Sequence, residues 1–142
     1  MRRFGTYGLL GWCAEVAFTA VGEYAKTRDP RLSGHTSLWM FPIYGLMAPL
    51  YEPLHDALRD RAPAPARAAV YAAGFFAFEY GTGRLLRELV GDAPWDYSHA
   101  PLHLHGLIRA DYLPVWAAAG LAMEHVHDRL DAGEHGRIPP PS

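Results

Sequence analysis

The sequence lacks the residue patterns that identify several large classes of protein. Its single cysteine, Cys13, excludes an internal disulfide framework. No Walker A loop and no GxSxG elbow occur, so these residues offer neither a P-loop for ATP nor a hydrolase nucleophile. The net charge of −2 lacks the basic excess of a nucleic-acid-binding protein, and we expect no nucleic-acid partner. HExxH and CxxC are also absent, and we assign no metal and no cofactor.

Four long apolar segments are present, at residues 4–22, 33–52, 67–86 and 106–127. Each approaches the length of about 20 apolar residues that a membrane-crossing helix needs. The mean hydropathy of −0.08 is ordinary for a soluble protein, which leaves a soluble four-helix bundle as the alternative. The first two segments, however, lack the charged stripe of a soluble helix. We therefore predict an all-α integral membrane bundle of about four transmembrane helices, forming one domain over residues 1–130 with a disordered tail over 131–142.

Three acidic residues within these segments are candidates for a polar pocket: Glu15, Glu79 and Glu124. A carboxylate near the middle of a membrane helix costs about 2.5–3.5 kcal/mol, so it must face a polar interior, become protonated or pair with a base. Tyr44, in a Pro-Ile-Tyr-Gly sequence, and Arg84, within two turns of Glu79, are candidates for the same pocket. Structural hydrogen bonds and charges lying at the membrane interface are the simpler explanations.

An unusual polar link follows the third segment and contains Trp95, Asp96, Tyr97 and Ser98 in succession. Aromatic residues of this kind are typical of the membrane–water interface. An aspartate between two aromatic side chains is also a mixture that ligand-binding pockets use, so we include all four residues in the candidate site.

Two histidine pairs resemble metal ligands in composition but not in spacing. Side chains at positions i and i+2 of a helix point in different directions, which argues against a shared ion. We interpret them as surface or interfacial histidines: His103 with His105, and His125 with His127.

Several sequence blocks, in order along the chain, resemble a known group of proteins. The blocks are Gly11-Trp12-Cys13-Ala14-Glu15, Thr36-Ser37-Leu38-Trp39, Ile43-Tyr44-Gly45, Phe78-Glu79-Tyr80-Gly81-Thr82-Gly83, Pro94-Trp95-Asp96-Tyr97-Ser98, Gly106-Leu107-Ile108, Pro114-Val115-Trp116 and Met123-Glu124. They resemble the transmembrane protein 229 family and the bacterial proteins grouped with it as putative type IV ABC-transporter membrane components. The resemblance implies a multi-pass membrane protein of about four helices, without an established activity.

These observations favour a small transport or permease component with a polar intramembrane pocket, located in a membrane and, in a bacterium, in the cell membrane. Its expected partners are membrane lipids and a separate ATPase or other membrane subunit. Assembly into a homo-oligomer is also compatible with the sequence. One alternative is a membrane-embedded lipid-modifying enzyme that uses Glu79 or Asp96 as general acid or base. Another is a non-catalytic structural or partner subunit. Because no nucleophile is paired with a base, the residues favour a protein that is not an enzyme.

Overall fold

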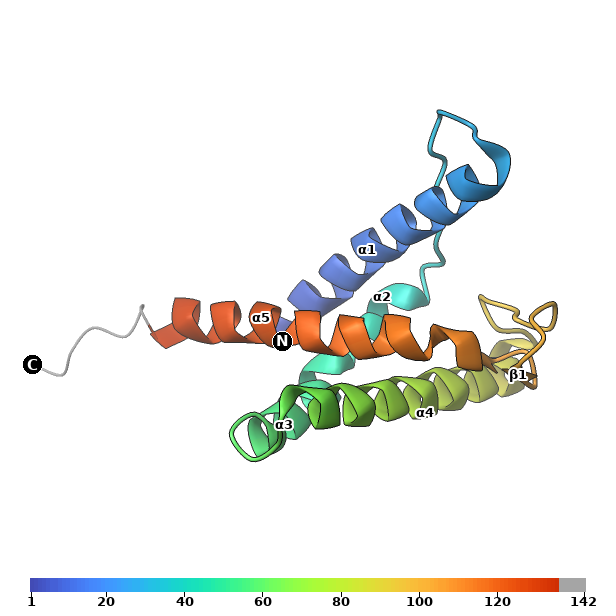
Figure 1. Ribbon diagram of the computed structural model, residues 1–142. Coiled ribbons are helices and arrows are strands. Elements are labelled where there is room, and N and C mark those ends of the chain that lie inside the picture. Colours follow the sequence, from blue (N-terminus) through green and yellow to red (C-terminus); the bar gives the residue numbers. More distant parts are fainter. Residues whose placement is uncertain (136–142) are drawn as a thin grey trace, which may run out of the picture. The chain divides into compact units, whose positions relative to one another are not determined.

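The structure, a computed structural model, describes residues 1–135, and its regular elements are almost entirely helical (Figure 1). Within these residues the elements are α1 (Arg2–Thr27), α2 (Met40–Gly45), α3 (Met47–Leu58), α4 (Ala64–Val90), β1 (His103–Leu104), β2 (Ile108–Arg109), the 3-10 turn η1 (Ala110–Tyr112) and α5 (Leu113–His135). The prediction of an all-α fold is confirmed. The chain divides into two compact units, Met1–Leu54 and His55–Ser142, which are described separately below.

The first unit is built on the long helix α1. The helix ends where Arg28 adopts a left-handed conformation with a φ of 58°, and the Arg28 N–H donates to the Tyr24 carbonyl. The segment that follows runs back beside α1 to reach α2 (Figure 1). Two side chains of α1 attach it: the Trp12 indole N–H donates to the Ser37 carbonyl at 3.0 Å, and the Thr19 hydroxyl donates to the His35 carbonyl at 2.9 Å.

Helices α1 and α2 pack closely because α1 presents a glycine where they meet. The ring of Tyr44 lies directly against Gly11, in space that any larger side chain would occupy. Apolar side chains from both helices complete the core of this unit, including Tyr7, Met40 and Ile43. The close approach brings Tyr44 to within one helical turn of Glu15 along α1.

The second unit is built on α4 and α5, which lie side by side (Figure 1). Helix α4 begins directly after Pro63, whose extended backbone caps the helix, and it ends at Gly91, where φ is 91°. Proline is well suited to the first turn of a helix, and the proline-rich stretch around Pro63 starts one here. The rings of Phe75 and Trp116 stack between the two helices with centroids 5.1 Å apart.

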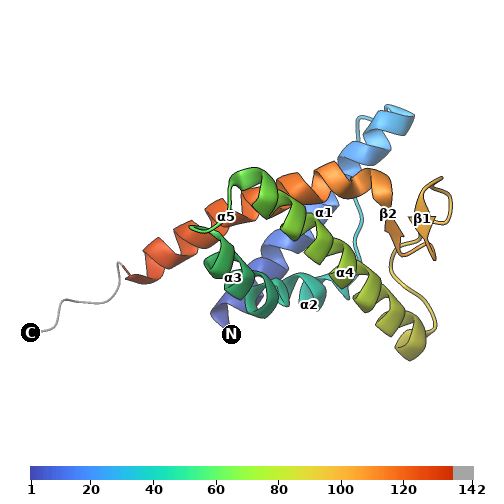
Figure 2. The ribbon, with the colours of Figure 1, turned by 60° about the horizontal axis from the view of Figure 1, so that its bottom comes forward.

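A small hairpin leads from α4 back to α5. Strands β1 and β2 are antiparallel, with His103 opposite Arg109, and Figure 2 shows β2 leading into the start of α5. The turn of the hairpin buries Leu107 completely, and the indole N–H of Trp95 donates to its carbonyl at 2.9 Å. These contacts fix the link between α4 and β1 against α4.

The structure corrects the predicted spans. Across the described residues, no helix combines the length and the apolar character that crossing a membrane requires. The predicted span 33–52 is a loop followed by the whole of α2 and the first half of α3, and the span 106–127 begins with a turn, β2 and η1. Segments 4–22 and 67–86 do lie within α1 and α4. Helix α5 continues to His135, beyond the point where we expected the tail to begin, and the rest of that tail lies outside the described residues.

Candidate functional site

Glu124 is the centre of the most extensive polar cluster in the second unit. Only 2% of this α5 residue is exposed. Its carboxylate accepts two hydrogen bonds from Arg67, from Nε at 2.6 Å and from Nη2 at 3.0 Å, and a third from the Arg59 guanidinium. The Tyr71 hydroxyl donates a fourth at 2.9 Å. A buried carboxylate with this many charged donors is compensated for its loss of water.

The donors of this cluster come from both sides of the turn between α3 and α4. Arg59 directly follows α3, whereas Arg67 and Tyr71 stand one turn apart on α4 and therefore share a face. Tyr71 reaches Glu124 because its ring packs directly on Gly120 of α5. The hydrogen bond from Arg67 is the main reason that the pKa of the Glu124 carboxyl lies below its ordinary value, despite burial. Glu124 is thus a carboxylate held in its charged form by its neighbours.

Two buried histidines adjoin this cluster. The rings of His55 and His127 meet edge to face with centroids 4.6 Å apart. The His127 Nε2 atom lies 3.2 Å from a carboxylate oxygen of Asp56 and 3.3 Å from one of Asp131. The Tyr71 hydroxyl lies 3.4 Å from His55 Nδ1. Burial, and then the neighbouring His127, lower the pKa of the His55 imidazole.

Glu79 belongs to a separate group near the other end of α4. The Tyr97 hydroxyl donates to its carboxylate at 3.0 Å, and the Tyr97 ring packs edge to face on Tyr112. Glu79 follows Tyr71 by eight residues, a rise of about 12 Å along the helix, and the Phe75–Trp116 stack lies between these two levels. The structure therefore places Glu79 and Glu124 in two different groups.

The remaining candidates from the polar link take part mainly in local contacts. Asp96 is exposed and accepts from the backbone N–H of Ser98 at 2.9 Å and from its hydroxyl at 2.6 Å. These hydrogen bonds lower the pKa of the Asp96 carboxyl and form a tight turn. Arg84 is exposed and pairs with Glu88 at 3.3 Å, one turn away on the same helix.

Glu15 and Tyr44 are brought together in the first unit. Burial raises the pKa of the Glu15 carboxyl, although the hydroxyls of Tyr44 and Thr36 and the charge of His35 act in the opposite direction. Among the described residues, the Glu15 Oε2 atom is buried and accepts no hydrogen bond. The carboxyl is accordingly biased towards its protonated form relative to an exposed glutamate.

Sequence reasoning identified Glu124 but missed the residues around it. The missed residues are His55, Asp56, Arg59, Arg67, Tyr71 and Asp131. A signal was available in the one-turn spacings Arg67–Tyr71 and His127–Asp131, each of which places two polar side chains on one helix face. The other partners meet only through tertiary packing.

Comparison with models of known protein families identifies a family for this chain. The family model described as "Putative ABC-transporter type IV" matches residues 3–139, which bears out the bacterial family in the resemblance. No solved structure matches the chain.

Proposed function

We propose that this chain, which belongs to the putative ABC-transporter type IV family, is a membrane-associated component of a transport system whose ATPase resides on another subunit. Family membership supports a role related to transport. The 142 residues contain no Walker A motif, so ATP hydrolysis by a P-loop requires a partner. The proposal thus assigns the chain to the part of such a system that does not hydrolyse nucleotide.

The observation that carries the proposal is the exposure of large apolar side chains on the long helices. In the first unit, α1 exposes Phe18 at 51% and Val21 at 63%. In the second unit, α4 exposes Leu89 at 72% and Val90 at 55%. Removing such a side chain from water contributes about 1.5–3 kcal/mol, so several of them provide a substantial driving force for association with lipid.

The polar cluster around Glu124 is buried, which also supports an apolar environment. Glu124 is 2% exposed and His127 is 3% exposed, while leucine and valine lie outside on α4. In a fully aqueous environment the usual preference is the reverse, with apolar side chains inside and ionisable ones in water. Helices that meet lipid on the outside and pair their charges inside account for both features.

Cell fractionation with matched variants tests the proposal. The tagged full chain should sediment with membranes, and the double variant Leu89→Ser/Val90→Ser should shift towards the supernatant. Arg84→Ser, an exposed polar change on the same helix, is the control and should behave like the original chain. Circular dichroism shows whether each variant keeps its helices.

Affinity purification of the same tagged chain tests the transport part. A stoichiometric partner that carries a Walker A motif and hydrolyses ATP is the expected result. Sedimentation with membranes but without any ATPase partner would overturn the role in transport. Recovery of the original chain in the supernatant would overturn the membrane association, whatever partner it carried.

A further inference from the structure

The two buried histidines of the second unit lie within a set of metal-ligand atoms that the proposed transport role does not use. Three side chains each offer one possible ligand atom, and these atoms lie within 4.8 Å of one another: His55, Asp56 and His127. His55 and Asp56 are consecutive residues in the last turn of α3, and His127 belongs to α5. Imidazole nitrogens with a carboxylate oxygen are a donor set that suits Zn²⁺ and other divalent transition metals.

Two distances from His127 match those between the ligands of a tetrahedral ion. With bonds of about 2.0–2.1 Å, two ligand atoms of a tetrahedral zinc ion stand roughly 3.3 Å apart. The His127 Nε2 atom already lies 3.2 Å from Asp56 Oδ1 and 3.3 Å from Asp131 Oδ2. His127 and Asp131 stand one turn apart on α5, which makes Asp131 the candidate for a fourth ligand.

The Nδ1 atom of the His55 ring has neighbours of the kind that a metal-binding imidazole usually has on its other nitrogen. Its Nδ1 atom faces the Tyr71 hydroxyl at 3.4 Å and a Glu124 oxygen at 3.9 Å. Its Nε2 atom faces the opposite side, 3.6 Å from an oxygen of Asp128. A carboxylate or hydroxyl on one ring nitrogen commonly fixes the tautomer in which the other nitrogen binds the ion. Tyr71 and Glu124, which lie beside Nδ1, would therefore orient the His55 ring for metal binding.

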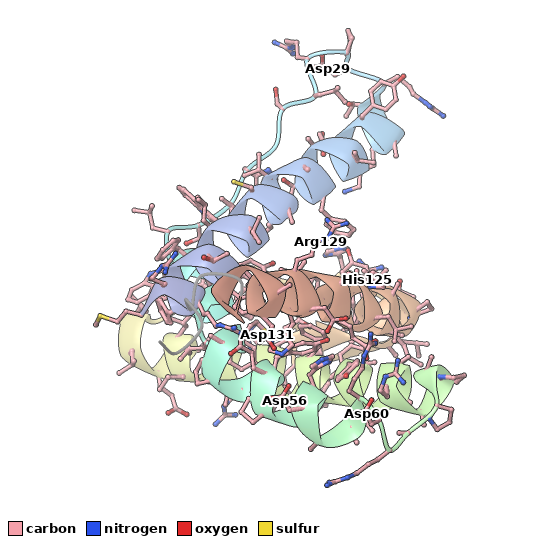
Figure 3. All side chains as sticks on the ribbon, turned by 90° about the vertical axis from the view of Figure 1, so that its left-hand side faces the viewer. Asp29, Asp56, Asp60, His125, Arg129 and Asp131 are labelled. Atoms are coloured by element: carbon pink, nitrogen blue, oxygen red, sulfur yellow. The ribbon has the colours of Figure 1, made fainter. Side chains whose placement is uncertain are left out.

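The site is open to solvent on its carboxylate side. The side chains of Asp56 and Asp131 are 65% and 41% exposed, whereas His127 is 4% exposed. In Figure 3, Asp56 lies on the α3 side of α5, and His125 and Arg129 lie on the far side of α5. An ion can thus enter between the carboxylates, and the exposed His125 is directed away from it.

We propose that His55, Asp56 and His127, with Asp131 as a fourth ligand, bind one divalent transition-metal ion such as Zn²⁺. The ion would join the end of α3 to α5, residues far apart in the sequence, and would stabilise their packing. The proposal does not depend on the transport role, because it concerns the purified chain alone.

Zinc titration of the purified full chain, after removal of bound metal with a chelator, tests the site. Calorimetry should show one ion per chain, and Co²⁺ substitution should give the visible absorption bands of a tetrahedral nitrogen–oxygen site. Asp56→Asn and His127→Ala should each weaken binding by about 10-fold or more. His125→Ala, which alters an exposed histidine two residues from His127, is the control and should bind as the original chain does.

Three results would overturn the proposal. One is no zinc binding by the original chain, which would leave the histidines as members of an ion-pair network. Another is unchanged affinity in both Asp56→Asn and His127→Ala. A third is equal loss in His125→Ala. If His127→Ala fails to fold, Asp56→Asn decides the question. Asp56 is exposed, and the asparagine amide occupies the same space as the carboxylate that it replaces.

Discussion

Replacing Glu124 by glutamine should destabilise the second unit strongly, although the two side chains have nearly the same shape. The change removes the negative charge that accepts from Arg59 and Arg67 and leaves both guanidinium groups facing an uncharged amide. Arg67 is only 12% exposed, so water cannot fully replace the lost partner. Removal of one member of a buried ion pair typically costs about 3–5 kcal/mol, and we expect a loss in this range in the free energy of unfolding.

The control for this prediction is Glu88→Gln, which alters the exposed pair with Arg84 at 3.3 Å. Exposed pairs of this kind contribute about 0.3–0.5 kcal/mol, so the control should hardly change stability. Urea denaturation in the presence of a chelator measures both variants without any contribution from bound metal. Hydrogen exchange of peptides from α4 and α5 then locates the loss. A loss below about 1 kcal/mol for Glu124→Gln would refute the view that this carboxylate holds the cluster together.

Two further substitutions test the arguments about the burial of Glu15 and about the packing at Gly120. Burial raises the pKa of the Glu15 carboxyl, so the folded first unit favours the protonated form. The stability of this unit should therefore decrease as the pH rises from below the ordinary glutamate pKa through the raised pKa of the folded protein. Thermal melts of Glu15→Gln should lose this pH dependence. Gly120→Ala should cost about 1–3 kcal/mol because the new methyl group meets the Tyr71 ring. Gly133→Ala, at an open helix position, should be neutral or slightly stabilising in the same urea titration, and equal effects at the two sites would contradict the packing argument.

The sequence predicted helices well where apolar residues continued without interruption. Residues 4–22 and 67–86 lie inside α1 and α4, as the length of their apolar runs indicated. The stretch 33–52 failed as a single helix because it contains proline and glycine near its middle, and it forms a loop and two short helices, of which α2 packs against α1. A long apolar run does not reveal whether its partner is a membrane or another helix of the same unit.

The candidate site was predictable only in part. Glu124 was identified because a carboxylate in an apolar segment needs a partner, but Arg59 lay between the predicted spans and Arg67 at the very start of one, and neither was chosen as a partner. His127 was set aside as a metal ligand because the side chains of His125 and His127, two residues apart on a helix, point in different directions. The structure does place His125 in an exposed position. The imidazole nearest to His127 is instead His55, which is 72 residues earlier in the sequence and adjacent only in three dimensions.

The position of Arg59 and Arg67 on either side of one turn has a consequence for chain continuity. Both guanidinium groups bind the same Glu124 carboxylate, and Arg67 also donates to the Ala62 carbonyl at 2.7 Å. Helix α5 therefore contacts both ends of the turn between α3 and α4. Arg59, which directly follows α3, is thus joined to Arg67 of α4 through Glu124 as well as through the chain. We expect a chain cut after the exposed Arg61 to keep these contacts between its two fragments, together with those of His127 to Asp56 and of Arg59 to Asp128.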